Sequence, residues 1–397
     1  MLCLFLVSIL FIMFLSNSFA TNLGIENTVT FAYSPFVAYF FLRNPPFSRT
    51  PLTRWMIFVI CFALFAYVFR LIGLGQNYFK NYLTFLVFPM LISIDLEFES
   101  QYYLKALRKC LVVFFVAECG LAIYEKLTET YLFYDPIAKM TASQLQYYVS
   151  PADWSFRSYA FFDHPLMNAM IVCVIMSFIL ASSMQMKCKL LLFMLGYTSL
   201  WCFNARGATI VTSVFMIPYL LQSLHKTRMK NKKWIYLAFA SFASVFIWLV
   251  FTTSLGGRLL GGETELMDGS AQTRVDVFSF YHFITPVQLW FGSPDLYMYV
   301  MEKLNAGGVE NGVITMILRE GILFTIIILM LLFHIQRLQI AQIGKYTRLW
   351  LLAIFYIIGT MNPALSSALP WTFWMLSYYA FVVGVPAASN GCKTVIK

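Results

Sequence analysis

The stretch that decides the fold is LLLFMLGYTSLWCFNARGATIVTSVFMIPYLLQSL, which runs from Leu190 to Leu224. A hydrocarbon core about 30 Å thick is crossed by a helix of roughly 17–25 apolar residues. The stretch is too long for one such helix, and it is interrupted only by Asn204-Ala205-Arg206-Gly207. It therefore predicts two short membrane helices, at 189–204 and 206–224, joined by a tight turn.

The composition of the whole chain points to the same class of protein. Of its 397 residues, 60% are hydrophobic, 18% are aromatic and only 12% are charged, and the mean hydropathy is +0.72. Soluble domains carry about 25% charged residues, so a soluble fold of this composition would expose large apolar patches. The aromatic content also excludes a disordered chain. We expect an all-α polytopic integral membrane protein.

The apolar segments predict about twelve membrane-spanning helices in a single transmembrane domain, 1–397. The predicted spans are 2–21, 28–43, 55–75, 80–96, 107–125, 165–184, 189–204, 206–224, 233–253, 309–333, 346–362 and 369–388. The first span follows Met-Leu-Cys without a basic segment, so we expect it to stay uncleaved. Between the spans lie two long segments, 126–164 and 254–308.

The distribution of charged residues predicts which loops face the cytoplasm. If the N-terminus is cytoplasmic, every short inside loop is basic, and of the 18 acids only Asp95, Glu97 and Glu99 lie in an inside loop. This is the positive-inside pattern, and it predicts that both termini are cytoplasmic. The net charge of +10 then reflects topology and contact with anionic membrane lipids, with no need for a nucleic-acid partner.

Both long segments, 126–164 and the larger 254–308, fall on the outside. The inside loops are too short for a nucleotide-binding domain, and no GxxxxGK[ST] phosphate loop occurs. Any chemistry is therefore expected on the outer face. Within the larger segment, the pattern at 274–284 predicts a short surface helix with Val275, Phe278 and Phe283 on one side, ended by Pro286.

Two ionisable residues lie within apolar sequence, where the cost of burying a charge has to be explained. Arg206 interrupts the long apolar stretch, where a charge costs about 2.5–3.5 kcal/mol even on the insertion scale. Beside Gly207, at the start of a helix, it predicts an anion site, and the alternative is an arginine that extends to lipid headgroups. Glu118, within the fifth span, is expected to be buried or to face a cavity.

Glu310 and Asn311 begin the tenth span at its outer end. Glu310 can be a carboxylate that favours the helix dipole, or a general base beside a cation-lined cavity. Arg319 is nine residues further on, which places it on the opposite side of the helix from Glu310. For Arg319 and Glu320 we expect a role in helix packing or a partner elsewhere in the bundle.

Further ionisable residues lie in the two outer segments. The sixth span is preceded by Arg157, Asp163 and His164. These residues either line the outer opening of a cavity in the membrane domain or lie in a solvated loop. For Arg258 a surface salt bridge is expected, whereas Arg274, beside the surface helix, could reach a lipid phosphate. The eight cysteines show no CxxC spacing, and we expect neither a metal site nor a cofactor.

Four of these segments resemble the O-antigen ligase and polymerase superfamily of bacterial envelope proteins. Residues 157–165 resemble its Arg-x-x-Gly-x-Phe-x-x-Pro element, with Ala160 at the position of the glycine. Residues 205–208 resemble its Ser-Arg-Gly-Ala turn, and Arg274 with Gly292-Ser293-Pro294 resembles its Arg and Gly-x-Gly of the large periplasmic loop. Residues 310–324 resemble the ligase signature His-[Asn/Ser/Gln]-x9-Gly-x-x-[Gly/Thr/Tyr], with glutamate in place of the histidine and Phe324 at its end.

The resemblance implies glycosyl transfer at the periplasmic face of the bacterial inner membrane. Glu310 in place of histidine favours the polymerase branch, which moves a glycan from undecaprenyl diphosphate to another lipid-linked repeat unit. Arg206 and Arg274, with Arg157, would bind the donor diphosphate, and Glu310 would be the base. His164, Asn311 and Arg258 are further candidate contacts. A chain-length regulator and a flippase would be partners, and no metal would be needed.

Three other functions remain open from the sequence. An O-antigen ligase would use lipid A core as the acceptor and would otherwise look alike. A flippase for lipid-linked oligosaccharides has a similar number of spans, although we would expect it to lack long outer segments. A scaffolding membrane protein would leave Arg206 and Glu310 unexplained.

Overall fold

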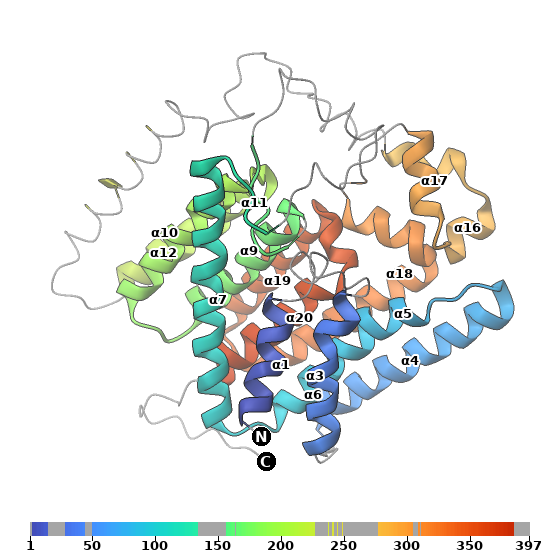
Figure 1. Ribbon diagram of the computed structural model, residues 1–397, viewed down its shortest axis with the longest axis horizontal. Helices are drawn as coiled ribbons and strands as arrows, with labels where there is room; N and C mark the ends of the chain where they lie inside the picture. Colours follow the sequence, from blue (N-terminus) through green and yellow to red (C-terminus); the bar gives the residue numbers. More distant parts are fainter. Residues whose placement is uncertain are drawn as a thin grey trace.

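The computed structural model describes residues 2–14, 28–43, 50–133, 156–162, 164–226, 237, 240, 241, 244, 248, 277–304, 309 and 311–384. Every regular element within these ranges is helical, as expected (Figure 1). Among the described residues, four helices are long and apolar enough to cross a membrane, and three shorter helices are also apolar. Most of the predicted span 233–253 lies outside the described residues, as do 134–155 and the Gly-rich 254–270.

The described residues up to 128 form the first group of helices. α1 (Leu2–Phe14) packs along α3 (Thr28–Arg43), and α4 (Pro51–Leu74) follows. The next helix is continuous from residue 79 to residue 97, with a π-helical turn in its middle. Its parts are α5 (Phe79–Tyr82), η1 (Leu83–Val87) and α6 (Phe88–Glu97), and α7 (Gln101–Thr128) comes after it.

The long apolar stretch folds as predicted into two helices. α9 (Pro165–Ala181) precedes it, and α10 (Met186–Cys202) ends just before Asn204. A second continuous helix is then formed by α11 (Arg206–Val211), η3 (Thr212–Met216) and α12 (Ile217–Lys226). The hydroxyls of Tyr197 and Ser213 lie 2.9 Å apart, so the two helices fold back against each other around the turn.

The C-terminal part begins with short helices and continues with long ones. The short ones are η4 (Val277–Phe283), α16 (Pro286–Phe291) and α17 (Leu296–Lys303). The long ones and their extensions are α18 (Gly312–Gln339), η5 (Ile340–Gln342), α19 (Lys345–Thr360), η6 (Pro363–Ser366), α20 (Ala368–Tyr378) and η7 (Tyr379–Val383).

The described part of the predicted surface helix, Val277–Phe283, is helical. η4 is a 3-10 helix, and three residues per turn place Val277 and Phe280 on one side, where both are buried. Phe278, which the sequence placed on the apolar side of a helix lying on the membrane surface, is 59% exposed. η4 ends at Phe283, and Pro286 then begins α16.

The distribution of polar and apolar side chains is that of a helical membrane protein. α9 and α20 lie at the centre of the bundle, and nearly all their residues are buried (Figure 1). In α4, at the edge, Arg70 is 0% exposed whereas Ile72, two residues on, is 81% exposed. A helix that buries its charge and exposes isoleucine is suited to a lipid surrounding.

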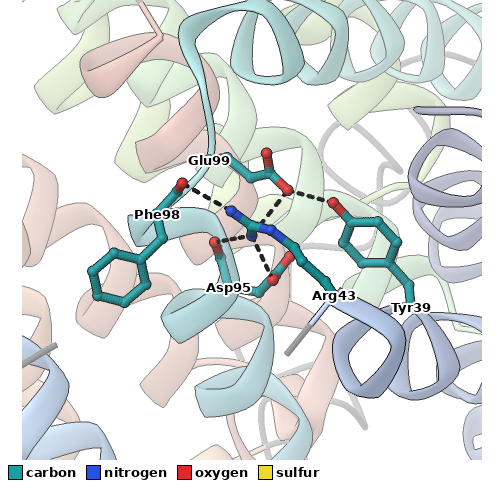
Figure 2. A network of polar contacts seen from close by, with 5 residues as sticks. All are labelled: Tyr39, Arg43, Asp95, Phe98 and Glu99. Atoms are coloured by element: carbon teal, nitrogen blue, oxygen red, sulfur yellow. Dashed lines mark hydrogen bonds and ion pairs between the residues drawn. The ribbon is translucent and has the colours of Figure 1, made fainter. Parts of the chain in front are cut away.

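An ionic network ties α3 to the end of α6 (Figure 2). The guanidinium of Arg43 lies 2.6 Å from the Asp95 carboxylate and 3.0 Å from that of Glu99, and it donates to the carbonyl of Phe98 at 2.8 Å. Tyr39 donates its hydroxyl to Glu99. The acids that the sequence assigned to an inside loop thus have partners in the fold.

Candidate functional site

The turn between α10 and α11 positions Arg206. Asn204 adopts a φ of 52°, a left-handed conformation that asparagine tolerates, and the Ala205 N–H donates to the Leu200 carbonyl at 3.2 Å. Arg206 is the first residue of the following helix, and its side chain is half-buried. The charge therefore stands at the positive end of the helix dipole, where an anion is favoured.

The segment that carries Arg157 lies against the same turn. The Ser158 N–H donates to the Cys202 carbonyl at 3.0 Å, in the last residue of α10, and the Ser158 hydroxyl donates to Ala122 at 2.6 Å. On the other side, Lys126 donates to the Phe156 carbonyl at 2.8 Å, and burial lowers the pKa of this lysine. Arg157 thus lies between two anchored residues, near the turn that holds Arg206.

Two carboxylates at the end of α7 hold the rest of this segment. Glu125 accepts the N–H groups of Tyr159 and Ala160 at 2.8 and 2.9 Å. Glu118 is buried, as predicted, and it accepts the Phe161 N–H at 3.3 Å. Ala160 has a φ of 44°, a conformation in which glycine has no steric cost. Glycine could therefore replace Ala160 without strain in the backbone.

His164 and Asn362 fix the entry of the chain into α9. The Nδ1 atom of His164 accepts the Leu166 N–H at 3.2 Å and caps the helix, although the imidazole is exposed. Asn362 donates to the Leu166 carbonyl and accepts the Ala364 N–H at 2.8 Å. Asn362 was not among the residues predicted from the sequence. The pattern that could have indicated it is an asparagine directly before a proline at the end of a long apolar segment.

The end of α19 brings the candidate residues together. A Cβ atom built on Gly207 would lie 3.2 Å from the sulfur of Met361, so the start of α11 touches this segment. A Cβ atom on Gly312 would lie 2.5 Å from the Asn362 carbonyl oxygen, so the start of α18 touches it too. The segments that carry Arg206, His164 and Asn311 therefore meet around residues 361 and 362.

Asn311 caps α18 and has a structural role. Its Oδ1 atom accepts the N–H groups of Val313 and Ile314, both at 3.1 Å. Glu310, the candidate base directly before it, lies outside the described residues, as do Arg258, Arg274 and Asp163. Within the described ranges, no group of three His, Cys, Asp or Glu residues is placed to hold a metal ion.

α18 is broken at Gly321, the glycine of the resembled signature. Gly321 has a φ of 74° and a ψ of 163°, and a Cβ atom there would lie 2.5 Å from the Phe291 backbone nitrogen. Gly292, with a φ of 67°, approaches from the other side, and its Cβ atom would lie 2.5 Å from the Arg319 carbonyl oxygen. Two elements of the resemblance, Gly292 and Gly321, are thus in contact because neither has a side chain.

The break frees three carbonyl groups, and each finds a donor. The Ser293 N–H donates to Leu318 at 3.1 Å, the Tyr78 hydroxyl donates to Arg319, and Arg70 donates to Glu320. Inside a membrane an unsatisfied carbonyl is costly, so a broken helix persists only where such donors are supplied. The donors come from two distant parts of the chain, residues 70–78 and Ser293.

Arg70 and Glu320 form a buried pair beside the break. An Arg70 nitrogen lies 3.5 Å from the Glu320 carboxylate, which also accepts the Tyr82 hydroxyl at 3.0 Å. The guanidinium stacks over Tyr78 and Phe324, at 4.2 and 4.7 Å from the ring centres. The expected partner of Glu320 elsewhere in the bundle is therefore Arg70, which sequence reasoning passed over although it is a lone charge in an apolar span.

Comparison with protein-family models, with curated proteins and with solved structures found no match for this chain. The site therefore has to be interpreted from its own chemistry. It consists of arginines at a helix start and on an anchored segment, next to a broken membrane helix. Arginine at a helix N-terminus is suited to phosphate groups, because both the charge and the N–H groups favour an anion.

Proposed function

We propose that this protein is a multi-pass glycosyltransferase of the bacterial inner membrane that polymerises a surface polysaccharide. It would transfer a glycan from undecaprenyl diphosphate to the terminal sugar of another lipid-linked repeat unit, on the periplasmic face. The proposal includes twelve spans with both termini in the cytoplasm. The described parts of four loci from distant parts of the sequence, each selected by the same resemblance, lie along the first half of α18 and the end of α19, and this observation supports the proposal most directly.

Specific contacts bring these segments together. The Arg157 segment bonds to the end of α10, the Arg206 turn touches Met361, and residue 312 touches the same segment as Met361. Gly292 meets the break at Gly321, nine residues further along α18. A scaffold protein would have no reason to bring these elements together along the first half of α18.

In the proposed reaction the hydroxyl oxygen of the acceptor sugar attacks the anomeric carbon of the donor. The bond from that carbon to the diphosphate oxygen breaks, and the diphosphate leaves with the electron pair. Arg206, Arg157 and Arg274 would stabilise the charge on the diphosphate. Glu310 would take the proton of the attacking hydroxyl, and displacement from the opposite face would invert the anomeric centre. Asn311, by capping α18, would position the residue before it.

The test compares surface glycans on a gel from cells that lack the protein and from cells that carry the wild type, Glu310→Gln, Arg206→Gln or Arg337→Gln. Arg337 is exposed near the other end of α18, so Arg337→Gln removes the same charge away from the site. We expect Arg337→Gln to keep the long-chain ladder. The other two variants should lose it while one repeat unit stays attached to the acceptor, and immunoblots should show equal amounts of protein.

The other outcomes separate the alternatives. If long chains accumulate on undecaprenyl diphosphate and the acceptor receives none, the protein is a ligase. If the lipid-linked repeat unit accumulates on the cytoplasmic side, it is a flippase. An unchanged ladder in cells that lack the protein would overturn the assignment to envelope-glycan synthesis.

A further inference from the structure

A cavity of about 160 Å³ lies beside the broken helix. Three elements enclose it: the start of the helix 79–97, the first half of α18, and the junction of η6 with α20. Its polar lining consists of Asn81, Thr84, Arg319, Glu320, Ser366 and Ser367. A water molecule needs about 10–15 Å³ of such volume, so the cavity can hold a small polar group with several waters.

The charges around this cavity do not balance. The Glu320 carboxylate lies 3.5 Å from a nitrogen of Arg70 and accepts the Tyr82 hydroxyl, so its negative charge is matched by Arg70. Arg319 forms no ion pair, and its guanidinium forms no hydrogen bond, with any described residue. Arg319 also interacts electrostatically with Glu320, so the two arginines and the one carboxylate beside the cavity together carry a net charge of +1. A charge in this position within a membrane helix calls for an anion.

The neutral groups of the lining complement this charge. The hydroxyl protons of Thr84 and Ser366 already go to backbone carbonyls, at 2.9 and 2.8 Å. The Asn81 amide has no side-chain hydrogen bond within the described residues, and Ser367 only accepts, from the Leu369 N–H at 3.4 Å. Arg319, Asn81 and Ser367 thus offer donors from three separate elements.

Donors that approach from three elements fit a tetrahedral oxyanion better than a planar carboxylate, which a guanidinium alone can bind in a bidentate way. The cavity also lies at the starts of two helices, 79–97 and α20. We propose that this cavity binds a phosphate group, with Arg319 as its counter-charge. The inference is independent of the proposed glycosyl transfer, because none of the residues assigned to that reaction lines the cavity.

The experiment measures binding to the purified full-length protein in detergent by native mass spectrometry. The probes are short-chain phosphatidic acid, the matching diacylglycerol without phosphate, and inorganic phosphate as a competitor. The variants are Arg319→Gln, Arg319→Lys, Asn81→Leu and the control Arg337→Gln. The wild type and the control should bind phosphatidic acid and not diacylglycerol.

We expect Arg319→Gln to weaken binding of phosphatidic acid about tenfold or more, because a charge-assisted hydrogen bond is lost. Asn81→Leu should weaken it less, and Arg319→Lys should retain part of it. Asn81 is half-buried and unbonded, so Asn81→Leu also tests the cavity if Arg319→Gln does not fold. Competition by inorganic phosphate would show that a free phosphate suffices, and its absence would show that the source is a lipid.

Two results would overturn the inference. One is equal binding of phosphatidic acid and diacylglycerol by the wild type. The other is unchanged affinity in both Arg319→Gln and Asn81→Leu. Failure here would leave the proposed polymerase untouched, because the gel assay of Arg206 and Glu310 does not depend on this cavity.

Discussion

Replacement of Arg70 by methionine tests how the broken helix is held together. Arg70 is fully buried, donates to the Glu320 carbonyl and pairs with the Glu320 carboxylate. Arg70→Met would leave that carboxylate without a cation and that carbonyl without its donor. Removing one partner of a buried pair costs about 3–5 kcal/mol, so we expect a loss of unfolding free energy in this range.

The double variant Arg70→Met/Glu320→Gln gives the decisive comparison. Glutamine removes the unmatched charge and can still accept the Tyr82 hydroxyl, so the remaining cost is the unsatisfied carbonyl, about 1–3 kcal/mol. The double variant should therefore be more stable than Arg70→Met alone. The coupling energy between the two positions should be about 2 kcal/mol.

The assay is unfolding of the purified protein in mixed micelles, with increasing SDS, followed by circular dichroism. Arg54→Met is the matched control, because Arg54 is exposed on the same helix, and it should change the free energy by less than about 0.5 kcal/mol. If Arg70→Met costs no more than this control, or if the two substitutions are additive, the buried pair does not hold the break.

Three further substitutions test other features of the fold. Gly321→Ala should destabilise the protein by more than about 2 kcal/mol in the same assay, because residue 321 has a positive φ and lies close to the backbone of residues 290 and 291. Gly120→Ala is the control; Gly120 has open space around it, so this substitution should be neutral or stabilising. Ala160→Gly should change stability by less than about 1 kcal/mol, since relief of the positive φ offsets the entropy cost of glycine; a larger loss would show that the Ala160 methyl group is required. Arg43→Gln should cost more than about 1 kcal/mol, as the Asp95 carboxylate is left buried, and Asp95→Asn in addition should recover part of this loss.

Several features of the candidate site could be predicted from the sequence. The turn at Asn204 and Arg206 follows from the length of the apolar stretch, because no single helix of that length fits a bilayer. Burial of Glu118 and a partner for Glu320 follow from the cost of a charge among apolar residues. These are consequences of local composition, and the structure confirms each of them.

Other features had no local signal. The periodicity of residues 274–284 predicts a helix with Val275, Phe278 and Phe283 on one side, but it does not indicate that η4 is a 3-10 helix that buries Val277 and Phe280 against α17 and α18. Arg70 is an isolated charge whose partner lies 250 positions away along the chain. Such a pairing depends on which helices become neighbours, and helix periodicity carries no information about that.

The sequence by itself determined that the chain is helical, apolar on its surface and divided at Arg206, because these properties depend on residues close together in the chain. Only the tertiary structure decided that Gly292 enters the break at Gly321, and that Arg70, Tyr78 and Ser293 supply the donors for it. The reason is physical: a carbonyl freed inside a membrane must be satisfied by whatever donor the fold brings to it, and that donor comes from a distant segment.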